Sequence, residues 1–113
     1  MYDEIWKVRS VKPYKEAKNH LFIGKLKEYT ITHVRLLCRT FHFGSSSAMG
    51  EKSVAVGDCV ERIIPWARIE CVNVLDNDFD FRTAKLIQEN GNIVLTDDST
   101  GLSYAVCKRS SGY

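Results

Sequence analysis

The chain has 113 residues, of which 44% are hydrophobic and 27% are charged, and its formal net charge is +2. These totals are typical of one globular domain, here residues 1–113, which is large enough to bury a core without a disulfide or a metal. A net charge this small points to no class of partner. No run of about 18 apolar residues is present to span a membrane, and residues 1–10 hold no apolar signal segment, so we expect a cytoplasmic protein without a membrane partner.

The first twenty residues predict a strand followed by a short helix. Residues 3–11, DEIWKVRSV, fit a strand or the start of the next helix, and we predict a strand. Residues 13–20, PYKEAKNH, begin with a proline suited to a first helical turn and continue with good helix formers. They also lie in the basic part of the chain, because residues 1–43 hold nine Lys and Arg against four Asp and Glu. Such a balance attracts phosphates or simply solvates a surface.

Two long strands are predicted at 20–29 and 32–43, because hydrophobic residues alternate there with a period of two. Gly24 lies inside the first strand, where a residue without Cβ permits a strong bend. In the second strand one face would carry Val34, Leu36, Cys38 and Thr40.

The segment FHFGSSSAMGEKSVAVG, residues 41–57, holds two glycines followed by a lysine and a serine. A phosphate-binding loop needs four residues between its glycines, then Lys, and then a helix. Here five residues separate Gly44 from Gly50, Glu51 precedes Lys52, and a strand-like sequence follows. We therefore predict a polar hairpin loop over 44–52 and no phosphate loop.

The rest of the chain also predicts strands. Residues 53–66 and 67–75 are rich in Val and Ile, and the break between them falls at Pro65-Trp66, since proline cannot donate to a central ladder. Residues 83–109 predict a three-strand meander with turns at Asn90-Gly91 and at 98–101. Its strands would be 84–89, 92–97 and 102–108. The prediction is therefore an all-β small barrel.

Sequence motifs for chemistry are weak. The acidic turn DNDFD, residues 76–80, lacks the glycine and the closing glutamate of a calcium loop. The four cysteines form no CxxC pair and lie in apolar strands, which predicts buried thiols. Cys38 and His42 share a strand face without further ligands nearby. No nucleophile occurs in a recognisable turn. We therefore expect no enzyme, no cofactor and no metal site.

One pattern is similar to a known family. Residues 22–38, FIGKLKEYTITHVRLLC, resemble the first motif of the Sm-like (LSm/Hfq) proteins, in which a glycine-containing strand runs through a turn into a second strand. Residues 60–74, VERIIPWARIECVNV, resemble the second motif, two strands joined by a tight turn. The resemblance covers 13–75 as an SH3-like or Sm-like barrel core with its short N-terminal helix, and the meander at 76–113 is an extension.

The resemblance implies a homo-oligomeric ring of six or seven subunits that binds single-stranded RNA without catalysis. The residues carried over to RNA binding lie in or near the two turns: Thr30, His33, Arg35, Trp66 and Arg68. Thr30 stands where the family has an acidic residue, and His33 where it has the asparagine that contacts bases. Stacking on aromatic rings and cations at phosphates would supply the binding.

Other interpretations of the same residues stay open. Trp66 also fits the barrel core or a subunit interface, and His33 fits an ordinary turn residue. A ligand- or protein-binding β-barrel without nucleic acid would show a neutral or acidic surface at the turns 29–35 and 65–68. A small enzyme would bring His33, His42 and an acid such as Glu61 into one cavity at the barrel mouth.

Overall fold

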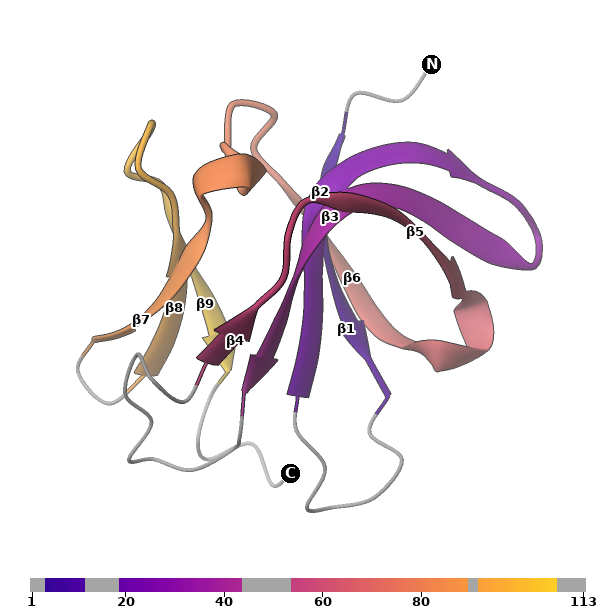
Figure 1. Ribbon diagram of the computed structural model, residues 1–113, viewed down its shortest axis with the longest axis horizontal. Helices are drawn as coiled ribbons and strands as arrows, with labels where there is room; N and C mark the ends of the chain where they lie inside the picture. The colour runs from indigo at the N-terminus through magenta and orange to yellow at the C-terminus, as the bar shows by residue number, and fades with distance from the viewer. Residues whose placement is uncertain (1–3, 12–18, 44–53, 90–91, 108–113) are drawn as a thin grey trace.

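Nine strands and two short 3₁₀ turns make up the structure, a computed structural model that describes residues 4–11, 19–43, 54–89 and 92–107 (Figure 1). All strand pairs are antiparallel, and no helix longer than one turn occurs among these residues, which confirms the all-β prediction. The elements are β1 (Ile5–Ser10), β2 (Asn19–Tyr29), β3 (His33–Phe43), β4 (Val54–Val56), β5 (Val60–Pro65), η2 (Trp66–Arg68), β6 (Ile69–Leu75), η3 (Phe81–Thr83), β7 (Lys85–Glu89), β8 (Asn92–Thr96) and β9 (Ser103–Cys107).

Six strands form one sheet in the order β4-β3-β2-β1-β6, and β5 also pairs with β3. β3 is long enough to serve both partners, because Phe41 pairs with β4 while Val34 pairs with β5. β2 contains a register shift between Leu26 and Glu28, and β2 and β3 bend together in Figure 1. The short η2 turn connects β5 to β6, which returns to pair with β1 on the other side of the sheet.

Gly24 has the role that its position in a bent strand predicts. A Cβ built at this residue would overlap the backbone carbonyl oxygen of Leu37 and lie 2.5 Å from Cα of Cys38. Both atoms belong to the paired strand β3, so β2 and β3 approach each other too closely here for any side chain. The sequence predicted the glycine's structural importance from strand bending, and the structure adds this close approach as the reason.

The two faces of the six-stranded sheet bury separate hydrophobic clusters. The inner cluster has all its members on strands of this one sheet, so the sheet must curl around it; it contains Trp6, Val8, Leu26, Val34, Leu36, Cys38 and Ile64. The outer cluster fills the space between the sheet and the meander; it contains Ile5, Leu21, Ile23, Phe41, Leu75, Phe79, Phe81, Ala84, Leu86, Ile93 and Leu95. The face predicted for 32–43 is therefore buried, including Thr40.

The three-stranded meander β7-β8-β9 covers the outer face of the sheet. Polar contacts fix it there: Arg39 Nη1 donates to the carbonyl oxygens of Arg82 (2.9 Å) and Ala84 (2.8 Å), and Lys7 Nζ donates to that of Ala105 (3.1 Å). The predicted turn at 98–101 is also present, and the Asp97 carboxylate before it accepts hydrogen bonds from the backbone N–H groups of Thr100 and Gly101.

Several sequence predictions need correction or fall outside these residues. The segment 53–66 contains two strands, because residues 57–59 interrupt the ladder between β4 and β5. Residues 19 and 20 of the predicted helix belong to β2, and residues 12–18 lie outside the described ranges, as do the loop 44–52 and the turn at 90–91. Cys71 is exposed rather than buried, since it lies on the outermost strand β6.

Candidate functional site

The turn between β2 and β3 is closed by its own side chains. Thr30 Oγ1 accepts hydrogen bonds from the backbone N–H groups of Thr32 (3.1 Å) and His33 (3.1 Å). The His33 ring nitrogen Nδ1 lies 3.3 Å from Thr30 Oγ1 and 3.0 Å from Thr32 Oγ1. Hydroxyl groups commonly stabilise turns in this way. Thr30 and His33 therefore have a local structural role in shaping the turn.

Trp66 joins this turn to the η2 turn. Its indole Nε1 donates to the carbonyl oxygen of Thr30 (2.7 Å), and its backbone N–H donates to that of Thr32 (3.1 Å). Its half-buried ring packs against the inner cluster, with its centroid 6.5 Å from that of Trp6. The structure thus brings together three of the five residues expected at the RNA site, Thr30, His33 and Trp66, and shows the indole N–H already engaged.

The ion pairs of Arg35 are made with strand residues and not with the two turns. Its guanidinium pairs with Glu28 (3.3 Å) and Glu61 (3.5 Å), and its neighbours Val34 and Leu36 point into the inner cluster. Because side chains alternate along a strand, Arg35 lies on the opposite face of β3. It is balanced by two carboxylates there.

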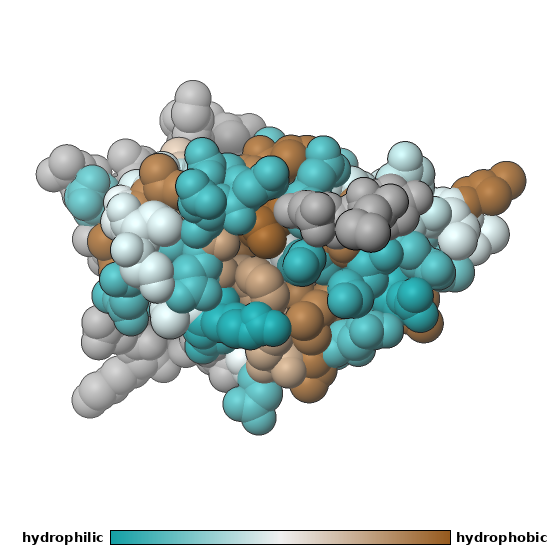
Figure 2. All heavy atoms as spheres, turned by 90° about the horizontal axis from the view of Figure 1, so that it is seen from above, coloured by the Kyte–Doolittle hydropathy of each residue, from teal (hydrophilic) through white to brown (hydrophobic). Residues whose placement is uncertain are grey.

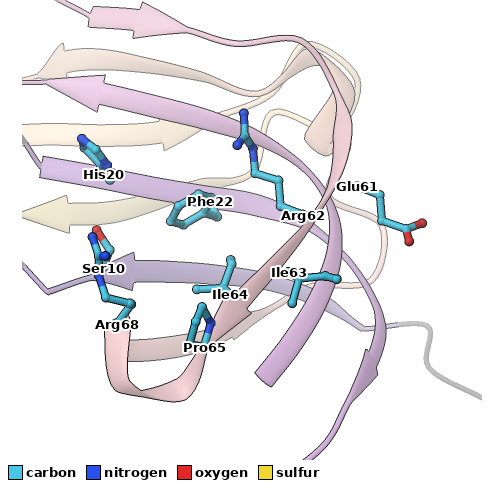
Figure 3. Close-up of a pocket in the computed structure, with 9 residues that line it drawn as sticks. All are labelled: Ser10, His20, Phe22, Glu61, Arg62, Ile63, Ile64, Pro65 and Arg68. Carbon is cyan, nitrogen blue, oxygen red and sulfur yellow. The ribbon is translucent and has the colours of Figure 1, made fainter. Parts of the chain in front are cut away.

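The fifth expected residue, Arg68, lines a pocket of about 360 Å³ at the open end of the curled sheet (Figure 3). We call this the basic pocket. Its lining residues come from β1, β2, β5 and η2; they are Ser10, His20, Phe22, Glu61, Arg62, Ile63, Ile64, Pro65 and Arg68. In Figure 3 the side chains of Glu61 and Ile63 point away from the others, while Ser10, His20, Phe22 and Ile64 face one another across the space.

Fixed backbone contacts position the arginines of the basic pocket. Arg62 lies opposite Leu36 in the β3–β5 pair, two residues before the buried Ile64, so it projects on the same side of β5 as the inner cluster. The backbone carbonyl of Arg68 accepts a hydrogen bond from Val11 N–H (2.7 Å), which holds η2 beside the end of β1. Both guanidinium groups are thereby attached to hydrogen-bonded backbone.

The electrostatic character of the basic pocket is positive. Within the described part of the chain, the side chains of Arg62 and Arg68 form no hydrogen bond and no ion pair, and Glu61 is engaged with Arg35. The His20 ring lies 4.1 Å from that of His42. Burial, with added repulsion from His42 and Arg68, lowers the pKa of His20 below its ordinary value of 6.5. The lining thus holds two arginines and one carboxylate, Glu61, which is paired with Arg35, so the pocket is positive on balance.

Sequence reasoning missed most of the basic pocket. Ser10, His20, Phe22 and Arg62 are separated by up to 52 positions, and no local motif connects them. One signal was readable: Arg62 has the same strand parity as the buried Ile64, although its own side chain is exposed.

Hydrophobic side chains are exposed at two other places. Ile31, at the tip of the β2–β3 turn, is 93% exposed, and Figure 2 shows hydrophobic side chains at the end of the molecule where this turn lies. On the two outermost strands of the curl, Ile63 of β5 is 64% exposed and Val74 of β6 is 57% exposed. Among the described strands, β5 pairs only with β3 and β6 only with β1, so each leaves one edge without a partner.

Comparison of the chain with models of protein families, with curated proteins and with solved structures finds no match. No helix in the described ranges is long and apolar enough to cross a membrane. Across the same residues, no three His, Cys, Asp or Glu side chains are grouped so that they could hold a metal ion. Of His33, His42 and Glu61, only Glu61 lines the basic pocket.

Proposed function

We propose that the chain is an Sm-like small barrel that assembles with copies of itself and binds single-stranded RNA without catalysis. The observation that carries this proposal is the basic pocket, in which Arg62 and Arg68, neither of them in a described ion pair, line the same space as the aromatic ring of Phe22. Cations for phosphates together with an aromatic face for bases are the recurring components of sites for single-stranded nucleic acid.

The strand order supports the small-barrel part of the proposal. The strands β1, β2, β3 and β5 follow one another around the curl, and η2 then leads into β6, which pairs with β1. A meander closed by a final strand beside the first is the arrangement expected of an SH3-like barrel. β1 belongs to this sheet although it precedes the range 13–75 of the resemblance, so residues 5–10 are included in the proposed barrel.

The proposed RNA surface combines the basic pocket with the two adjoining turns. Arg68 belongs to the pocket, while Trp66 and the turn of Thr30 and His33 form its continuation along η2 and the β2–β3 turn. Arg35 is paired with Glu28 and Glu61, so the proposed surface assigns it no contact with phosphate. The binding groups are therefore Arg62 and Arg68, with Phe22 as the aromatic face.

The proposed assembly uses the two strand edges that lack a partner. β5 and β6 expose their backbone edges and the side chains of Ile63 and Val74. Exposed strand edges pair readily with those of another chain. Pairing β5 of one copy with β6 of the next would give a head-to-tail contact, which closes into a ring if the rotation permits. A ring of six or seven is the size that the family resemblance implies.

A specific observation favours a second candidate, a protein-binding barrel without nucleic acid. Tyr29 is 50% exposed and Ile31 is 93% exposed at the same turn, and such apolar tips are suited to protein contacts. In that case the turn would be the binding surface and the basic pocket would have no ligand.

Both candidates can be tested on the full chain. Native mass spectrometry of protein purified without nuclease should show six or seven copies with extra mass that ribonuclease removes. Binding to fluorescein-labelled oligouridine and oligoadenine at 50 mM salt should weaken by about tenfold or more in the double variant Arg62→Gln, Arg68→Gln. The matched control is Arg82→Gln, an exposed arginine on η3 that stacks over Phe81. A double variant that binds as the wild type does would contradict the proposed RNA surface.

A further inference from the structure

We infer that the basic pocket receives a phosphomonoester, the terminal phosphate of a nucleotide, with the base packed against Phe22. For a nucleotide at the end of a strand, this inference rests on the proposed RNA function. The same chemistry is present in a free mononucleotide, and the experiment below distinguishes the two sources.

The charge and the donors of the basic pocket favour a phosphomonoester over an internal phosphodiester. A phosphomonoester carries a charge of about −1.5 to −2 near pH 7 and presents three acceptor oxygens, whereas a diester in a strand carries one charge. Arg62 and Arg68 approach from different elements, and Ser10 adds a hydroxyl donor. Both guanidinium groups line the pocket without described partners, and each can donate two parallel hydrogen bonds to phosphate oxygens.

The size and the floor of the basic pocket fit one nucleotide. Its volume of about 360 Å³ lies at the small end of the range for small-molecule sites. Phe22, Ile64 and Pro65 supply an apolar surface next to the cations. Phe22 is held in β2 between Val8 on one neighbouring strand and Thr40 on the other. A ring fixed in this way can support a base at little cost in conformational entropy.

His20 offers a second readout for the same ligand. Burial lowers the pKa of His20, and repulsion from the His42 ring on β3 and from Arg68 on η2 adds to this effect. A phosphate dianion bound beside His20 would favour that form and raise the pKa of His20. Binding of a phosphomonoester should therefore be accompanied by proton uptake at His20.

The experiment compares ligands with and without a terminal phosphate, and with and without a nucleoside. Isothermal titration calorimetry at 50 mM salt would use hexauridylate with a 5′-phosphate, with a 3′-phosphate and with hydroxyls at both ends, together with UMP, AMP, uridine and inorganic phosphate. We expect one phosphorylated form to bind about tenfold or more tightly than its hydroxyl counterpart. The difference should disappear in Arg62→Gln and in Arg68→Gln and persist in Arg82→Gln. NMR titration of His20 should show its pKa rise with that ligand.

The outcomes separate this inference from the proposed function. Mononucleotides that bind as tightly as the phosphorylated strands would support the inference with a free nucleotide as ligand, and a preference seen only in strands would support a strand end. Equal binding of phosphorylated and hydroxyl strands would overturn the inference while RNA binding stands. Binding of UMP or AMP without binding of any strand would overturn the RNA function and leave the inference intact. Inorganic phosphate that competes as well as UMP would overturn the role of Phe22.

Discussion

The cationic side chains on the two faces of the six-stranded sheet make different contacts. On the outer face, which the meander covers, Lys7 and Arg39 donate to backbone carbonyl groups of the second sheet. On the inner face, Arg62 and Arg68 lie at the open end of the curl, and their side chains meet no hydrogen-bond acceptor in the described ranges. The first pair joins two sheets, whereas the second pair is available to a ligand.

This difference follows from what covers each face. The outer cluster extends over both sheets, so any cation beneath the meander must satisfy its donors within the protein. The inner cluster ends near Ile64, and beyond it the curl remains open toward Phe22 and His20. A charge placed there stays hydrated until a ligand arrives. The contrast between the covered outer face and the proposed binding face can be tested with matched substitutions.

The largest expected effect is on the free energy of unfolding, when two phenylalanines on opposite faces of the sheet are replaced by alanine. Phe41 is fully buried in the outer cluster, so Phe41→Ala should lower the free energy of unfolding by about 3–5 kcal/mol. Phe22 is half-buried at the basic pocket, and Phe22→Ala should cost roughly half as much because part of its surface is already exposed. Urea denaturation of both variants gives the comparison. Equal losses at the two positions would contradict the division into a covered and an open face.

The next largest effect on stability is expected when arginines on the two faces are replaced by methionine. Arg39→Met retains the aliphatic stem but leaves the carbonyl groups of Arg82 and Ala84 without their donor, which should cost about 1–3 kcal/mol. Arg62→Met and Arg68→Met should change the free energy of unfolding by less than about 0.5 kcal/mol, since no described contact is lost. Thermal unfolding at one protein concentration measures all three. A destabilisation by the Arg68 variant as large as that of Arg39 would assign Arg68 a structural role.

The sequence predicted the sheets better than the site, because strand and turn signals are local in sequence whereas the site joins residues that are far apart in sequence. The alternation of Val34, Leu36 and Cys38 identifies a buried strand face within a few residues, and Asp97 with Gly101 marks a turn locally. The helix prediction fails at residues 19 and 20, where pairing with β3 determines the strand. Tertiary pairing overrides local propensity in such cases.

The candidate site depends on contacts between distant segments. Trp66 meets Thr30 as the two-turn interpretation predicted, because both turns lie at the same end of the curl. Arg35 differs from that expectation since strand parity sends it to the face of Glu28 and Glu61. The basic pocket needs residues from four elements at once, and the sequence reveals only that Arg62 shares the strand parity of Ile64.

The smallest effect concerns pH and the buried titratable group on each face. Burial raises the pKa of the Cys38 thiol in the inner cluster to about 12 from 9.0, so the unfolded chain loses this proton first. The Cys38 contribution to the free energy of unfolding should therefore fall by about 1.4 kcal/mol per pH unit above pH 9. Burial lowers the pKa of Lys7 on the outer face, so the folded chain loses that proton first, and its contribution should rise as pH approaches 10.5.

The two contributions have opposite signs, so variants are needed to separate them. As pH rises toward 10.5 the wild type should gain stability relative to Lys7→Met, and above pH 9 it should lose stability relative to Cys38→Ala. Cys71→Ala, at an exposed position on β6, controls for removal of a thiol. Chemical denaturation at each pH supplies the differences. A Lys7→Met difference that stays constant with pH would mean that Lys7 remains hydrated beneath the meander, and the outer face would then be less completely covered than its contact with Ala105 indicates.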